Sequence, residues 1–156
     1  MKVSKMHIAS SLMIAIVLAL SSPSSAFETV ATVSGVGHVK DGDGILFGDI
    51  EVRLQGIAAP EDNSHKVETG GQESTANLME LVDGKYVVCH LDGTTAGKRP
   101  VGICFVNGIE VNRYQVRTGH ARDCGKFSGG RYLDDEMAAR RSGHDLHLIY
   151  ELPSYC

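Results

Sequence analysis

The sequence predicts a mainly β domain with helices, of the α+β class. Short runs rich in β-branched and aromatic residues recur after residue 30, and three later segments carry helical periodicity. Strong turn pairs, Gly48-Asp49 and Asn107-Gly108, follow apolar runs. No repeat, low-complexity tract or internal linker interrupts residues 27–156, so this stretch is expected to form one domain.

Residues 1–26 have the pattern of a signal peptide. Lys2 and Lys5 form a positive start, an apolar run follows at residues 8–20, and small residues precede the expected cleavage site. The run is shorter than the ~20 residues of a membrane-spanning helix, although an uncleaved membrane anchor is the alternative. We therefore expect an exported protein, periplasmic or secreted, whose mature chain (27–156) is monomeric and has no membrane segment.

Five strands and three helices are expected in the mature chain. Gly35 and Gly37 should bend the first strand, and a glycine follows each helix as a stop signal. The strands are expected at residues 30–39, 45–47, 50–54, 86–91 and 101–106, and the helices at 74–82, 111–118 and 133–142. The polar segment 61–71 is expected to be a surface loop. Val87, Val88, Ile103 and Phe105 are expected in the core.

The order of these elements favours a five-stranded barrel. A helix between the third and fourth strands of a small Greek-key barrel is the arrangement of the OB-fold. The predicted fold is therefore a five-stranded OB-fold barrel with about three α-helices.

All four cysteines lie in the mature chain, at positions 89, 104, 124 and 156. An even number in an oxidising compartment indicates two disulfides, and four cysteines allow three pairings. Cys89 and Cys104 fall in two runs that could be neighbouring strands, which favours pairs 89–104 and 124–156, the second holding the C-terminal tail. A cysteine metal site is the alternative, but no C-x-x-C spacing supports it.

The charge balance does not by itself indicate a nucleic-acid partner. The formal net charge is −4, and it becomes more negative if Lys2 and Lys5 are removed with the signal peptide. Nucleic-acid-binding proteins usually carry a basic stripe. Here basic residues concentrate only between positions 98 and 131, where a solvated surface is the simpler interpretation.

The segment 39–61 carries the residues that are best placed for chemistry. Asp41 and Asp43 open a hairpin, Arg53 lies in its apolar second strand, and Glu61 follows Pro60 beyond that strand. Carboxylates and a guanidinium that converge on one point suit a divalent cation and a phosphate.

Each of these residues also has a plainer interpretation. The Asp-Gly pattern is common in turns, Arg53 could form a structural ion pair, and Glu61 could be an ordinary loop acid. An EF-hand is excluded because its glycine is missing at the required spacing. His144 and His147 follow Gly143 rather than lying on a helix, so they are expected to be solvated rather than a metal pair.

Several short motifs occur in an order that is more informative than any one of them. They are Asp41-Gly42-Asp43, Val52-Arg53-Leu54, Gly56-Ile57, Ala59-Pro60-Glu61, Gly84-Lys85, Arg99 and Asn107-Gly108. In this order and at these spacings the chain resembles the staphylococcal nuclease (thermonuclease) family, from about residue 33 to 143. The tail resembles that of small exported bacterial members.

The resemblance implies an OB-fold and Ca²⁺-dependent hydrolysis of DNA or RNA. It implies that Asp43 is a Ca²⁺ ligand, and we expect a backbone carbonyl near Ala59 and water to provide the ion's other contacts. Arg53 and Arg99 would bind the phosphate, and Glu61 would be the general base or would position the attacking water. These residue types suit that chemistry, because hard cations take oxygen ligands and arginines match phosphoryl groups.

The sequence departs from the family pattern at two positions in this segment. Ala58 occupies the place of the family's second calcium-binding aspartate, and Gly44 replaces a usual threonine. The nucleotide-binding tyrosines of the best-known member also have no match around residues 119–125. We therefore expect weak Ca²⁺ binding and a nuclease or phosphodiesterase whose activity is impaired. A non-catalytic OB-fold module that binds an oligonucleotide, oligosaccharide or protein is the alternative.

Overall fold

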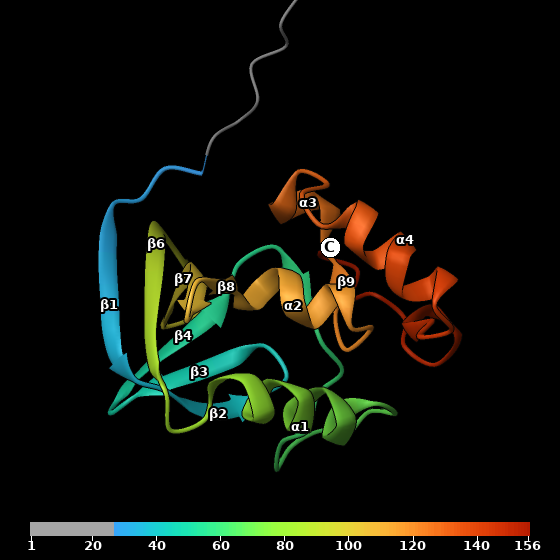
Figure 1. Cartoon of the computed structure of the whole chain (residues 1–156), viewed down its shortest axis with the longest axis horizontal. Helices are drawn as coiled ribbons and strands as arrows, with labels where there is room; N and C mark the ends of the chain where they lie inside the picture. The colour runs from blue at the N-terminus through green and yellow to red at the C-terminus, as the bar shows by residue number, and fades with distance from the viewer. Residues whose placement is uncertain (1–26) are drawn as a thin grey trace, which may run out of the picture.

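The computed structural model describes residues 27–156 as a mixed α+β domain with one large sheet (Figure 1). The expected signal peptide lies outside the described residues. No helix within residues 27–156 is long and apolar enough to cross a membrane.

The sheet has seven strands, and its main path runs β1-β6-β7-β4-β3-β2, with β8 paired to β7. Neighbours are antiparallel except β4 and β7, which are parallel. The bounds are β1 (Ala31–Val36), β2 (His38–Asp41), β3 (Gly44–Phe47), β4 (Ile50–Leu54), β6 (Tyr86–Ala96), β7 (Arg99–Val106) and β8 (Ile109–Glu110). A separate pair joins β5 (Ile57–Ala58) to β9 (Arg122–Asp123).

The α+β, OB-like class is confirmed, but the described sheet is not the closed five-stranded barrel that the sequence predicted. The expected first strand divides at Gly37 into β1, which pairs with β6, and β2, which pairs with β3. A Cβ at Gly37 would lie 3.0 Å from Val87 and 3.2 Å from Ile45, so the bend is packed against the core. The sheet therefore begins and ends on one bent segment without hydrogen bonds between β1 and β2.

Three helices match the predicted segments: α1 (Gly71–Val82), α2 (Val111–Arg117) and α4 (Leu133–Arg141). α1 begins three residues earlier than predicted, and a short α3 (Gly125–Ser128) and a 3₁₀ turn, η1 (Leu146–Leu148), are additional. α2 lies between the sheet and α4, and α1 packs along β2 (Figure 1). After α2 the chain returns to the end of β4, where β9 pairs with β5 and the amide of Cys124 donates to the Gly56 carbonyl.

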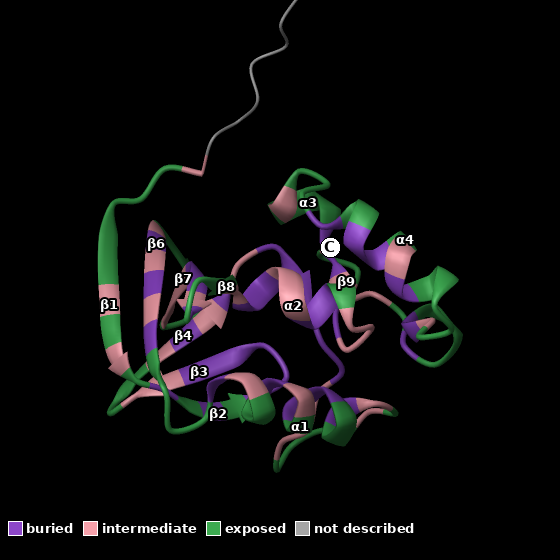
Figure 2. Ribbon diagram, in the orientation of Figure 1, coloured by how far each residue is buried: buried purple, intermediate pink, exposed green. Residues whose placement is uncertain are grey.

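The main core lies between the inner face of the sheet and the helices α1 and α2, where Figure 2 shows buried residues on facing elements. Val87 and Ile103 are buried as predicted, whereas Val88 and Phe105 are only half-buried. Alternation along a strand turns Val88 away from the face that carries its neighbours Val87 and Cys89.

Two disulfides have the pairing that the sequence favoured, Cys89–Cys104 and Cys124–Cys156. The first joins directly opposed residues of β6 and β7. The second joins the start of α3 to the last residue, and the amide of Lys126 donates to the Cys156 carbonyl at 3.1 Å. Two disulfides fit an oxidising compartment such as that of an exported protein.

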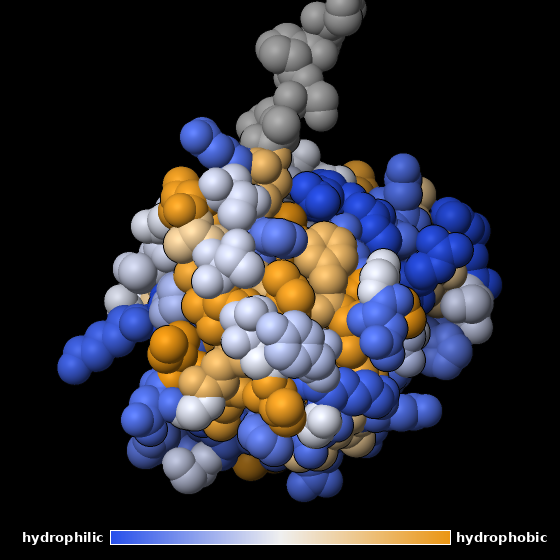
Figure 3. Space-filling model, turned by 60° about the vertical axis from the view of Figure 1, so that its left-hand side comes forward, coloured by the Kyte–Doolittle hydropathy of each residue, from blue (hydrophilic) through white to orange (hydrophobic). Residues whose placement is uncertain are grey.

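Apolar side chains also reach the surface (Figure 3). Exposed large hydrophobic residues among the described ones include Val30, Val36, Ile50 and Tyr86. Apolar atoms form more than half of an ordinary protein surface, so such exposure does not by itself mark a binding site.

Candidate functional site

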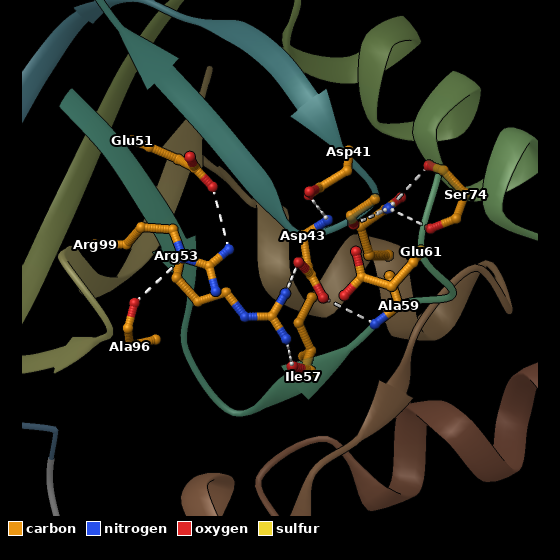
Figure 4. Close-up of polar contacts among 12 residues, drawn as sticks. Asp41, Asp43, Glu51, Arg53, Ile57, Ala59, Glu61, Ser74, Ala96 and Arg99 are labelled. Atoms are coloured by element: carbon orange, nitrogen blue, oxygen red, sulfur yellow. Dashed lines mark hydrogen bonds and ion pairs between the residues drawn. The ribbon is translucent and has the colours of Figure 1, made fainter. Parts of the chain in front are cut away.

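Asp43 and Arg53 meet because β3 and β4 form a tight hairpin. Gly44 lies opposite Arg53 in the register, and the amide of Leu54 donates to the Asp43 carbonyl at 2.9 Å. β5 then turns back so that the chain at Ile57 and Ala59 also reaches this point (Figure 4). The hairpin thus brings together an acidic and a basic side chain that are ten positions apart in the sequence.

The centre of the site is a buried ion pair between Nη1 of Arg53 and Oδ1 of Asp43. The Arg53 and Asp43 side chains are only 13% and 6% exposed. Nη2 of Arg53 donates to the Ile57 carbonyl at 3.2 Å, and Oδ2 of Asp43 accepts from the Ala59 amide at 3.0 Å. Burial lowers the pKa of the Arg53 guanidinium, an effect that Tyr155, Asp41 and Glu61 oppose. Several contacts therefore fix both side chains in one orientation.

Asp41 lies beside this pair as a second buried carboxylate. Its Oδ1 accepts from the amide of Asp43 at 3.3 Å. Burial raises the pKa of Asp41 above its usual value, and the nearby Arg53 opposes that rise. A Cβ at position 44 would lie 2.8 Å from Oδ1 of Asp41, so Gly44, one of the departures from the family pattern, leaves room for this carboxylate.

The loop between Asp41 and Asp43 packs closely on α1. Gln115, fully buried on α2, donates from Nε2 to the Gly42 carbonyl at 2.7 Å and to the Ser74 carbonyl at 3.1 Å. A Cβ at Gly42 would lie 2.1 Å from Oγ of Ser74 and 2.8 Å from Cβ of Ala59. Both aspartates therefore depend on a glycine between them.

Gly42→Ala is expected to lower the free energy of unfolding by about 1–3 kcal/mol, because the added methyl group overpacks the contact with α1. Urea unfolding measures the change. Gly125→Ala is the matched control, since a Cβ there meets only one atom, at 4.0 Å. Equal, small effects of the two substitutions would contradict the close packing of the aspartate loop.

Glu61 is held from its backbone. Its amide donates to Oε2 of Glu68 at 3.0 Å, and its carbonyl accepts from the Glu68 amide at 2.8 Å. Gly71 packs so closely that a Cβ there would lie 2.3 Å from the Glu61 carbonyl oxygen. The segment 61–71, predicted as a surface loop, is thus anchored to the start of α1.

The Glu61 side chain is half-buried and points towards the Asp43–Arg53 pair in Figure 4. Nδ2 of Asn63 donates to its Oε2 at 2.6 Å. Against the effect of burial, the carboxylates of Asp41 and Glu61 both raise the pKa of Arg53. The structure therefore brings Asp43, Arg53 and Glu61 together, as the sequence suggested.

Arg99 reaches the same region from the first position of β7. Its Nη1 pairs with Oε1 of Glu51 at 3.1 Å, and its Nε donates to the Ala96 carbonyl at 3.3 Å. Glu51 and Arg53 are two positions apart on β4, so their side chains lie on one face of the strand. Glu51 thus aligns Arg99 beside Arg53 (Figure 4).

A cleft of about 800 Å³ opens beside these arginines. Its basic lining residues are Arg53, Lys98, Arg99 and Lys126, against a single acid, Asp92. The chain is acidic as a whole, yet this cleft is basic. Such a cleft favours an anionic ligand.

The described residues offer oxygen donors for calcium but not a complete set. Both oxygens of Asp43 are engaged, by Arg53 and by the Ala59 amide. Ala58 is buried against Leu146 and Tyr150 and supplies only a methyl group. No group of three or more His, Cys, Asp or Glu side chains within residues 27–156 is arranged to hold a metal ion.

Sequence reasoning missed three residues that shape this region: Glu51, Phe127 and Tyr155. Glu51 had a usable signal, because it shares a strand face with Arg53. Phe127 and Tyr155 line the cleft from α3 and from the C-terminal tail. They had no such signal, since the fold of the tail places them there.

Two comparisons relate the chain to known proteins. A sequence model of the staphylococcal nuclease homologue family matches residues 51–146, more than half of the chain. The succinoglycan biosynthesis protein ExoI of Rhizobium meliloti (strain 1021) is 29% identical over 119 residues, which are 71% of this chain and 62% of that protein. The chain thus spans less than two thirds of the length of this relative. The family match covers most of the chain, including the positions of Arg53, Glu61 and Arg99. The chain therefore belongs to the family of staphylococcal nuclease homologues.

Proposed function

We propose that this protein hydrolyses phosphodiester bonds in DNA or RNA. The observation that carries the proposal is that Arg53 and Arg99 line one basic cleft and that the Glu61 side chain points towards Arg53. Arginines that line a cleft are suited to bind phosphate oxygens by bidentate hydrogen bonds. The carboxylate of Glu61 points towards the Asp43–Arg53 pair, and we assign it the role of the base (Figure 4).

In the proposed reaction, Arg53 and Arg99 bind the non-bridging oxygens of the phosphate that is to be cleaved. Glu61 takes a proton from a water molecule, whose oxygen attacks phosphorus in line with the leaving oxygen. The P–O bond to the leaving oxygen breaks, and that oxygen takes up a proton from solvent. The two guanidinium groups stabilise the charge that grows on the phosphoryl oxygens. Asp43 orients Arg53, and Glu51 orients Arg99.

Calcium is the expected cofactor, and we propose that Asp43 and the Ala59 carbonyl would hold it weakly. The ion would supply electrostatic stabilisation of the phosphoryl charge. Two features support low affinity: calcium must compete with Arg53 for Asp43, and position 58 lacks a carboxylate.

Ala58→Asp is expected to lower the thermal midpoint of the calcium-free protein, because it buries a carboxylate beside Leu146 and Tyr150. Calcium should then raise the midpoint of the variant more than that of the wild type, since binding to the folded state stabilises it. Differential scanning calorimetry with and without Ca²⁺ measures both effects. An equal response of the two proteins to Ca²⁺ would show that position 58 does not contribute to an ion site.

The first test of the function is hydrolysis of single-stranded DNA and of RNA by the purified protein, folded under oxidising conditions. The assay is run with millimolar Ca²⁺ and with EDTA. Cleavage supports the proposed hydrolysis, and loss of cleavage in EDTA supports Ca²⁺ as the cofactor. No cleavage by a folded protein would contradict it.

The alternative is a binding module without catalysis, for an oligonucleotide, oligosaccharide or protein. The incomplete set of calcium donors favours it. The relative ExoI is named as a succinoglycan biosynthesis protein, which is consistent with an oligosaccharide as the ligand of such a module. Tight, saturable binding without cleavage would support this module. For either function we propose an exported monomer.

A further inference from the structure

Two aromatic side chains line the basic cleft, and each is about half exposed to solvent. Phe127 is 54% exposed and Tyr155 is 51% exposed, and both line the cavity with Arg53 and Arg99. Their ring centroids are 6.4 Å apart and the planes are tilted by 55°. Since the rings already approach each other, a ligand would stack on the open side of the pair rather than between the rings.

The two rings come from distant segments that the structure ties together. Phe127 lies three residues after Cys124, and Tyr155 immediately precedes Cys156, so the disulfide Cys124–Cys156 joins their segments. The carbonyl of Phe127 accepts from Nε2 of Gln55 at 2.6 Å. The aromatic pair is therefore attached to the strand end that follows Arg53.

Gly56 allows this attachment to be close. Its φ of +72° favours glycine, and a Cβ there would lie 2.8 Å from Cβ of Ser128 in α3. The amide of Cys124 also donates to the Gly56 carbonyl at 2.9 Å. The start of α3 is thus packed directly on the turn between β4 and β5.

The surroundings of the rings indicate a ligand that is both anionic and planar. Nζ of Lys126 lies 5.8 Å from the centroid of the Phe127 ring, and Tyr155 lines the same cleft as Arg53. An aromatic platform beside cationic side chains is how proteins hold the bases and phosphates of a single strand. In a duplex the faces of each base are covered by its neighbours, so only an unpaired base can use such a platform.

We propose that Phe127 and Tyr155 form a stacking site for an unpaired nucleobase next to the phosphate held by Arg53 and Arg99, and that Cys124–Cys156 keeps this site assembled. The inference rests on the proposed function, since it names the form of nucleic acid that the same cleft accepts. Tyr155 lies outside the residues that match the family. The site therefore uses a part of this chain beyond the shared domain.

Binding rather than cleavage tests the site, so its failure can be distinguished from failure of the proposed hydrolysis. The probes are a fluorescent thymidine hexanucleotide, an abasic strand of equal length and charge, and the duplex form of the first. Their dissociation constants are measured by fluorescence anisotropy in EDTA. The wild type is expected to bind the thymidine strand about 5- to 150-fold more tightly than the abasic strand, the range for one stacked base.

Phe127→Ala and Tyr155→Ala should each reduce this preference and leave the affinity for the abasic strand unchanged. Cys156→Ser should reduce it in the same way. Tyr86→Ala is the matched control, because Tyr86 is an exposed aromatic residue on β6 that does not line the cleft. The duplex should bind no better than the abasic strand.

Three outcomes would overturn the stacking site. The first is equal affinity of the wild type for the thymidine and abasic strands. The second is an equal loss of affinity for both strands in Phe127→Ala. The third is displacement of the thymidine strand by a neutral oligosaccharide whose binding requires Phe127. A preference for thymidine without any cleavage would keep the stacking site and reject hydrolysis.

Discussion

Glu61→Gln is expected to reduce the hydrolysis of single-stranded DNA by about 10²- to 10⁴-fold, the usual contribution of a general base. The amide cannot accept the proton of the attacking water. It keeps the size of the side chain, and its oxygen can still accept from Asn63. The anchoring of Glu61 uses its backbone, so the substitution leaves those contacts intact.

The measurement is the initial rate at saturating and at limiting substrate, so that kcat and KM are separated. The loss should fall on kcat, because Glu61 acts on water rather than on the phosphate. Glu80→Gln is the matched control, since it removes an exposed carboxylate from α1. Unchanged cleavage in Glu61→Gln at an unchanged thermal midpoint would remove Glu61 from the reaction.

Much of the fold follows from local patterns in the sequence. The hairpin turn at Gly48, the left-handed conformations of Asn107 and Gly108, and the three main helices all appear where the sequence predicted them. The closed barrel was wrong because strand counting does not reveal how the bent first segment is shared. Its two halves pair with β6 and β3, a long-range choice set by packing around Gly37.

The site was predictable where neighbours in sequence are also neighbours in space. Asp43 and Arg53 belong to one hairpin, so their approach follows from the turn between them. Other residues of the site come together from distant parts of the sequence. Examples are the pair of Arg99 and Glu51 and the aromatic pair of Phe127 and Tyr155. These contacts depend on the parallel pairing of β4 with β7 and on the docking of the tail.

Arg53→Gln is expected to lower the free energy of unfolding by about 3–5 kcal/mol as well as to abolish cleavage. The substitution leaves the buried Asp43 carboxylate without its cation, and breaking a buried ion pair on one side is costly. Asp43→Asn alone should also destabilise the fold, because the buried guanidinium loses its partner. Urea unfolding gives the free energy of each variant.

The double variant Asp43→Asn, Arg53→Gln should recover much of the lost stability, because no uncompensated charge stays buried. It should not recover cleavage, because one of the two arginines that bind the phosphate is still missing. Lys66→Gln provides the comparison, since Lys66 pairs with Glu68 at the surface and its loss should leave the free energy of unfolding nearly unchanged. Additive destabilisation in the double variant would mean that Asp43 and Arg53 are not coupled in the folded protein. Cleavage by either Arg53 variant would mean that Arg99, which Glu51 aligns, binds the phosphate without Arg53.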